Sequence, residues 1–93
     1  MDFRKYDVEL SKIEYRALLR NSMISLMFKD QLRSPKNSGE FVTLHMSEST
    51  LDSLAGFVAA EANHAETNAD EQLLGSAFES LDATLNVIKT RGR

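Results

Sequence analysis

One short pattern occurs twice in this chain, and it limits the possible fold more than any other feature. In each copy three apolar residues alternate with polar ones and lead into a serine: Tyr6, Val8, Leu10 and Ser11 in the first, Val42, Leu44, Met46 and Ser47 in the second. After each serine the apolar residues recur every three to four positions. Alternation is typical of a half-buried strand, and the longer spacing is typical of an amphipathic helix. Each copy therefore predicts a strand that leads directly into a helix through a serine N-cap.

The predicted elements fill a single domain, residues 1–93. They are a strand at 5–10, a helix at 11–30, a loop at 31–40, a strand at 41–46, and helices at 47–64 and 68–90. Glu14 stands three residues after Ser11, which is the spacing of a capping box at the start of the first helix. The predicted fold class is α+β, in the order strand-helix-strand-helix-helix, with a short two-stranded sheet and three helices.

The two predicted strands make a marginal sheet, and we expect dimerisation to complete the fold. A two-stranded sheet generally needs a third strand or a covering helix to be stable in water. In addition, residues 23–28 are apolar on nearly every side of their predicted helix, apart from one serine, and such a helix must be covered all round. We therefore predict a homodimer with Met23, Ile24, Met27 and Phe28 in its interface. The alternatives for these side chains are the core of the single chain and a peptide-binding groove.

The net charge of −3 conceals two halves of opposite sign. Residues 1–40 contain eight Lys or Arg and six Asp or Glu, whereas residues 41–93 contain three and eight. One interpretation is that the basic half lies against the acidic half, either within one molecule or across a dimer. The other is a basic surface for an anionic partner. Lys12, Arg16 and Arg20 recur every four residues and form a basic stripe suited to phosphates, although the pI of about 5.3 is low for a nucleic-acid-binding domain.

The chain contains no cysteine, and none of its apolar runs approaches the length of a membrane span. Disulfides, thiolate metal ligands and a cysteine nucleophile are therefore excluded within this sequence. The first five residues are mixed in charge and no apolar stretch follows them, so no signal peptide is expected. These features predict a soluble cytoplasmic protein that has no membrane partner.

Glu61 and His64 form the most suggestive local motif. Their E-x-x-H spacing puts both side chains on one helix face, as in di-iron carboxylate proteins, which need two such pairs and two further carboxylates. The pair is a candidate metal site on this ground alone. The interpretation that we favour is a solvated helix end, where His64 lies near the negative terminus of the helix.

We predict no catalytic residue and no cofactor. His45 lies on the polar side of the second strand, and no serine stands in a G-x-S-x-G turn. The glycine-rich phosphate-binding motifs G-x-G-x-x-G and G-x-x-x-x-G-K-[ST] do not occur in the sequence. The sequence therefore favours a small non-enzymatic protein-interaction or regulatory module that acts as a homodimer and could also meet another protein. The alternative is a small nucleic-acid-associated regulator that uses Lys12, Arg16 and Arg20.

Overall fold

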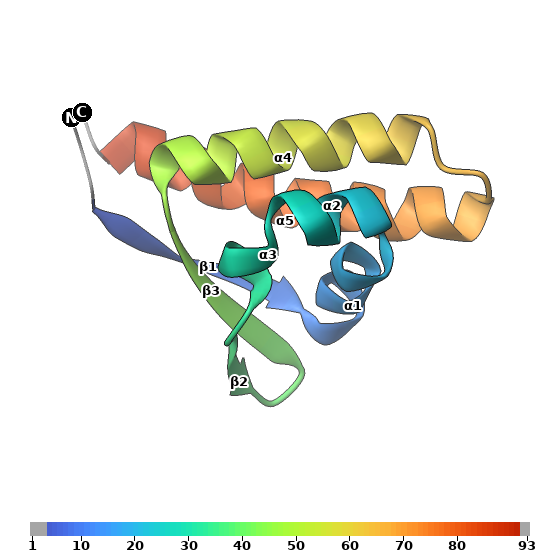
Figure 1. Cartoon of the computed structure of the whole chain (residues 1–93). Helices are drawn as coiled ribbons and strands as arrows, with labels where there is room; N and C mark the ends of the chain where they lie inside the picture. The colour runs from blue at the N-terminus through green and yellow to red at the C-terminus, as the bar shows by residue number, and fades with distance from the viewer. Residues whose placement is uncertain (1–3, 92–93) are drawn as a thin grey trace.

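The structure, a computed structural model, describes residues 4–91. Residues 1–3, on which the signal-peptide expectation partly depends, lie outside this range, as do residues 92 and 93. The described chain has an α+β fold of five helices and a three-stranded antiparallel sheet (Figure 1). Its elements are β1 (Lys5–Ser11), α1 (Lys12–Arg20), α2 (Ser22–Met27), α3 (Lys29–Leu32), β2 (Lys36–Ser38), β3 (Phe41–Ser47), α4 (Glu48–Asn63) and α5 (Asn68–Arg91).

The two copies of the strand pattern pair with each other. β1 and β3 are antiparallel neighbours, with Lys5 opposite Ser47 and Ser11 opposite Phe41. Because side chains alternate across a sheet, this register gathers the apolar residues of both strands on one face. That face is buried, whereas residues of the opposite face, such as Asp7 and His45, are exposed. The two serine caps consequently lie at opposite ends of the strand pair.

The prediction of a two-stranded sheet was wrong, because β2 forms a third strand inside the predicted loop. β2 pairs with the outer side of β3, so the strand order is β1-β3-β2. Gly39 and Glu40 connect β2 to β3 as a two-residue hairpin loop, and Gly39 has a φ of 62°. Glycine at the first position of such a loop suits a type II′ turn, which matches the twist of the strands.

The single helix predicted over 11–30 is three short helices. Asn21 has extended backbone angles (φ −78°, ψ 115°), and its Oδ1 accepts a hydrogen bond from the backbone N–H of Ile24 at 2.9 Å. It thereby ends α1 and caps α2. A second break falls at Phe28, between α2 and α3. Each break changes the direction of the chain. The side of α2 that faces the core is therefore not the side that an unbroken helix would bury.

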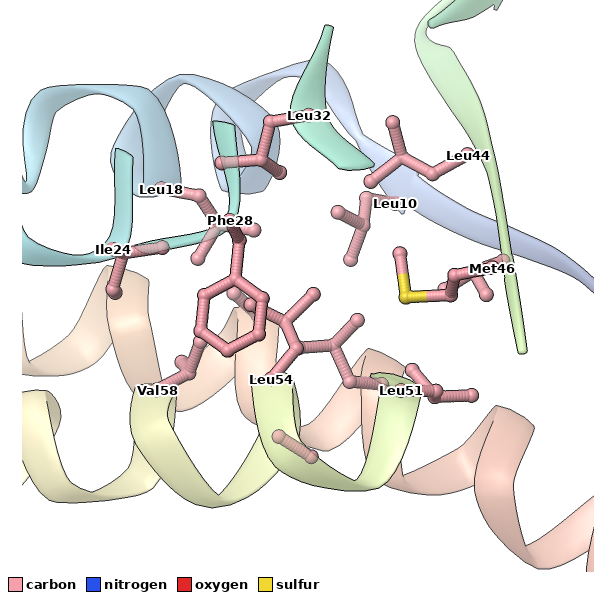
Figure 2. Close-up of a cluster of buried hydrophobic side chains, with 14 of the residues drawn as sticks. Leu10, Leu18, Ile24, Phe28, Leu32, Leu44, Met46, Leu51, Leu54 and Val58 are labelled. Carbon is pink, nitrogen blue, oxygen red and sulfur yellow. The ribbon is translucent and has the colours of Figure 1, made fainter. Parts of the chain in front are cut away.

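Helices α4 and α5 form an antiparallel pair that packs with the other helices against the apolar face of the sheet (Figure 1). A single hydrophobic core connects the sheet, helices α1 to α3 and the α4–α5 pair. Side chains from the strands, from α1 to α3 and from α4 meet in it, among them Leu10, Leu18, Ile24, Phe28, Leu32, Leu44, Met46, Leu51, Leu54 and Val58 (Figure 2). α5 contributes Leu74, Ala77, Leu81, Leu85 and Ile88. No helix within residues 4–91 is long and apolar enough to span a membrane.

Candidate functional site

Three apolar side chains on one side of α2 are exposed to solvent. They are Met23, Leu26 and Met27, which we call the α2 patch, and their exposed fractions are 48%, 71% and 59%. Their spacing of three and four residues puts them on one helix face. Contiguous exposed apolar surface on a protein marks sites of association more often than isolated apolar residues do. The α2 patch is therefore the candidate functional site.

Two of the four residues predicted for an interface lie in the core instead. Ile24 is fully buried and Phe28 is 8% exposed, with its ring edge-on to Phe57 at a centroid distance of 5.8 Å. Almost all of the surface of these two side chains is covered by the chain itself. Leu26 was absent from the predicted set, although it is the most exposed of the apolar residues of α2. The break at Asn21 explains the difference, because it starts α2 in a new orientation that the continuous-helix prediction did not include.

The basic stripe lies along α1, with Arg16 and Arg20 exposed and Lys12 half-buried. None of the three forms an ion pair with another described residue. Arg33 pairs with Asp30 at 3.8 Å and Lys89 pairs with Asp52 at 4.0 Å, so each of these two ion pairs lies within one half of the chain. Among the described residues, no cation of the stripe thus lies within ion-pair distance of a carboxylate, although Arg20 lines the same hollow as Glu61, Glu66 and Asp70 of the acidic half.

Glu61 and His64 lie beside a polar hollow of about 350 Å³, between the α1–α2 junction and the α4–α5 turn. Glu61 Oε1 accepts a hydrogen bond from Asn21 Nδ2 at 2.9 Å, which ties α4 to that junction. His64 is exposed and is the C-cap of α4. Residues 4–91 contain no group of three His, Cys, Asp or Glu side chains arranged to hold a metal ion. The observed contact of Glu61 is structural.

His45 faces solvent on the open side of the sheet. Its Nδ1 lies 2.7 Å from Oδ1 of Asp7, which is its directly opposed neighbour on β1. Half or more of each side chain is exposed. Neither side chain hydrogen-bonds a hydroxyl group among the described residues. The pair is a cross-strand contact of a kind that stabilises sheets.

A buried carboxylate, Glu14, was recognised from the sequence only as half of a capping box. Its Oε1 accepts the backbone N–H of Ser11 at 2.9 Å, and the Ser11 hydroxyl accepts the N–H of Glu14 at 3.1 Å. The same carboxylate also accepts the hydroxyls of Ser76 and Ser80 on α5. Ser76 and Ser80 are four residues apart and share a helix face. That spacing was visible in the sequence, but nothing local linked it to Glu14.

Tyr15, next to Glu14, makes a further long-range contact. Its hydroxyl donates to the carbonyl oxygen of Leu32 at 2.6 Å, which joins α1 to the end of α3. Burial raises the pKa of the Tyr15 phenol above its ordinary value of 10.0. α1 is therefore held on two sides: by its carboxylate to α5 and by its phenol to α3.

Comparison of the chain with protein-family models, with curated proteins and with solved structures gives no match.

Proposed function

We propose that this chain is a non-enzymatic protein-interaction or regulatory module that works as a homodimer formed through the α2 patch. The single observation that carries the proposal is the exposure of Met23, Leu26 and Met27 on one face of a helix. Burying such side chains removes apolar surface from water and is favourable by about 25 cal/mol per Å². Methionine side chains are flexible and adapt well to a facing surface.

The charges on either side of the patch support a second copy of the chain as the partner. α2 contacts α1 on one side and α4 on the other (Figure 1). α1 carries the basic stripe, whereas α4 contains Glu48, Asp52 and Glu61 and no Lys or Arg. A two-fold axis parallel to α2 sets α1 of one copy against α4 of the other. Because a symmetric contact is made twice, the dimer then gains two sets of opposite charges around one apolar centre.

The molar mass of the protein across a range of concentrations tests this proposal. We expect a dimer by light scattering or sedimentation equilibrium at tens of micromolar, and a monomer for Met27→Glu. The matched control is Val87→Glu, which adds the same charge to an apolar residue that is 50% exposed on α5. That variant should remain a dimer. A wild-type mass equal to one chain at all concentrations, or a Met27→Glu dimer, would contradict the proposal.

The basic stripe supplies a second test of the same dimer. Reversing both exposed arginines, in Arg16→Glu with Arg20→Glu, should weaken the dimer while the far-ultraviolet circular dichroism stays that of wild type. Added salt should weaken the wild-type dimer less than it weakens a purely ionic contact, because the apolar centre is not screened. A dimer that is unaffected by the reversal would show that α1 does not face α4 of the partner.

A second candidate function is nucleic-acid association through Lys12, Arg16 and Arg20. The observation that favours it is that none of the three cations is paired with a described residue. Binding of a labelled oligonucleotide at 50 mM salt that falls steeply by 200 mM, and that is lost in Arg16→Ala with Arg20→Ala, would support it. If this double variant remains a dimer, its loss of oligonucleotide binding is not caused by loss of the dimer, and the two functions are separate.

A further inference from the structure

β1 is an edge strand with one side available for pairing. Its only strand neighbour within residues 4–91 is β3, and β3 is followed by β2 on its other side. Alternate backbone N–H and C=O groups of an edge strand point away from the sheet. A short extended segment can use such groups to add one more strand, which is a recurrent way of binding peptides.

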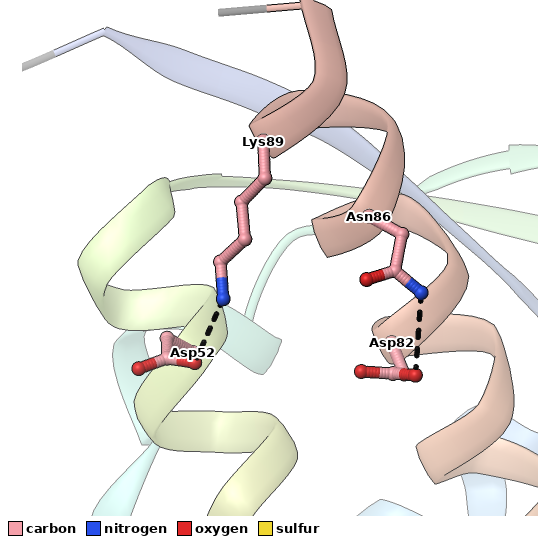
Figure 3. A network of polar contacts seen from close by, with 4 residues as sticks. All are labelled: Asp52, Asp82, Asn86 and Lys89. Atoms are coloured by element: carbon pink, nitrogen blue, oxygen red, sulfur yellow. Dashed lines mark hydrogen bonds and ion pairs between the residues drawn. The ribbon is translucent and has the colours of Figure 1, made fainter. Parts of the chain in front are cut away.

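A groove runs between β1 and the C-terminal turns of α5. These elements contact each other (Figures 1 and 3), and the hollow between them has a volume of about 300 Å³. Its lining comes from β1 and α5 with the residue before β1: Arg4, Tyr6, Asp7, Thr84, Val87, Ile88 and Arg91. Residues of β3 are not among them, so the groove is on the unpaired side of β1. Val87 is half exposed and supplies an apolar contact.

The described residues that line this groove have a net positive charge. Arg4 lies over the ring of Tyr6, with its guanidinium carbon 5.9 Å from the ring centroid, and Arg91 lines both this hollow and the adjoining one around Val87. Among the described residues of the lining, Asp7 is the one carboxylate, and it contacts His45 at 2.7 Å. Stacking on an aromatic face holds a guanidinium in place, and guanidinium groups match the geometry of carboxylates.

We propose that the groove between β1 and α5 binds an extended acidic peptide segment of a partner protein, which pairs with the outer edge of β1 as an additional strand. Alternate side chains of the segment then face the groove, where an apolar one packs on Val87 and carboxylates meet Arg4 and Arg91. This site is separate from the α2 patch. It gives the protein a partner other than its own second copy.

Fluorescence anisotropy with defined peptides tests the proposal. The probe is a labelled nonapeptide, Thr-Glu-Thr-Val-Thr-Val-Thr-Glu-Thr, whose glutamates and valines lie on one face of a strand. The comparisons are the same peptide with lysine for glutamate and with proline for the central threonine. We expect binding of the acidic peptide alone, because the basic one is repelled and proline cannot donate to the strand ladder. Backbone amide signals of β1, rather than those of β2, should shift on binding in heteronuclear NMR spectra.

Two variants on the same helix end make the result specific. Arg91→Ala should raise the dissociation constant about tenfold, which corresponds to one charge-assisted contact. Lys89→Ala removes the same charge but should change it less than twofold, because Lys89 reaches towards Asp52 on α4 (Figure 3). Val87→Glu should abolish binding and leave the dimer intact, whereas Met27→Glu should abolish the dimer and leave binding intact.

Several outcomes would overturn the proposal. They are no binding of the acidic peptide at 1 mM, equal binding of the lysine or proline peptide, and unchanged binding by Arg91→Ala. Binding of a single-stranded oligonucleotide with the same dependence on Arg91 would assign the groove to nucleic acid instead. A fall in molar mass on Val87→Glu would show that a second copy of the chain occupies it.

Discussion

The hydroxyl of Ser80 donates to the buried carboxylate of Glu14, with its Oγ 3.0 Å from Oε1 and 3.1 Å from Oε2. Ser76 donates to the same carboxylate one helical turn earlier. No lysine or arginine pairs with Glu14 among the described residues, so hydroxyl and backbone donors alone satisfy it. Such an arrangement fixes the position of α1 on α5, because a buried carboxylate that loses its donors is strongly destabilising.

Ser80→Ala should therefore lower the free energy of unfolding by about 1.5–3 kcal/mol, the range for a hydrogen bond to a charged group. Urea denaturation at pH 7 measures it. Ser53→Ala is the control, because Ser53 is an exposed helical serine on α4 and has no hydrogen bond from its side chain. The control corrects for the higher helix propensity of alanine. Equal stability of the two variants would show that the contact with Glu14 contributes nothing.

Ile24→Ala and Leu26→Ala should differ sharply although they lie two residues apart on α2. Ile24 is fully buried, so its truncation leaves a cavity and should cost about 2–5 kcal/mol. Leu26 is 71% exposed, and its truncation should change the stability of the single chain by less than about 0.5 kcal/mol. The measurement is chemical denaturation at a protein concentration low enough to populate the monomer. Similar losses for both variants would mean that α2 is oriented differently.

Gly56→Ala should stabilise the protein by about 0.5–1 kcal/mol. Gly56 is exposed in the middle of α4, and nothing lies within 4 Å of the position that an added Cβ would occupy. Alanine is the better helix former and restricts the unfolded chain more. Gly39→Ala provides the opposite case, because a φ of 62° strains an L-residue, and it should lower the melting temperature. A destabilised Gly56→Ala variant would indicate a close neighbour at α4, such as a second copy.

Tyr15→Phe should remove a pH-dependent part of the stability. The folded-state pKa of Tyr15 is raised by burial, so the folded protein holds this proton more tightly than the unfolded chain does. The resulting stability is fully present below the unfolded value of about 10 and is lost as the pH rises through the folded-state pKa. Below that range the variant should lose about 1 kcal/mol for its hydrogen bond to Leu32.

Urea denaturation of the wild type and of Tyr15→Phe between pH 8 and pH 11.5 measures this difference. The difference in the free energy of unfolding between the two proteins should decrease as the pH increases above 10, because the wild type loses the contribution of Tyr15. Lysine titration affects both proteins equally and cancels in this difference. Tyr6→Phe serves as the control for loss of a phenol elsewhere. A gap that stays constant over the whole range would show that the Tyr15 hydroxyl titrates alike in the folded and unfolded chains.

The local features of the fold could be predicted because they depend on neighbouring residues. The α+β class follows from the two periodicities, and the capping box follows from Ser11 and Glu14. The break at Asn21 could not be placed, because it depends on Glu61, 40 residues further along the chain. An asparagine within an apolar helical pattern is compatible with both a continuous helix and a cap.

The second role of Glu14 was missed for the same reason, whereas the third strand was missed because its three residues are polar and too few to show an alternating pattern. β2 is only three residues long, and the turn residues around it, such as Pro35 and Gly39, are typical of a loop as much as of a hairpin. The hydroxyls that Glu14 accepts lie 62 and 66 residues away. The residues predicted for an interface share Met23 and Met27 with the α2 patch, but which side of the segment is exposed depends on a chain direction that only the tertiary contacts determine.

Because α5 is the last helix of the described chain, its role in the core has a consequence for synthesis. On the ribosome, β1 and α1 emerge long before Ser76 and Ser80, the donors to Glu14, have been translated. Leu81 and Leu85, which pack in the same core as the apolar face of the sheet, are also translated late. A nascent chain that lacks α5 therefore has Glu14 without its two hydroxyl donors and the apolar face of the sheet without part of its cover. Stalling or premature termination before residue 76 should yield a polypeptide that chaperones retain or proteases remove.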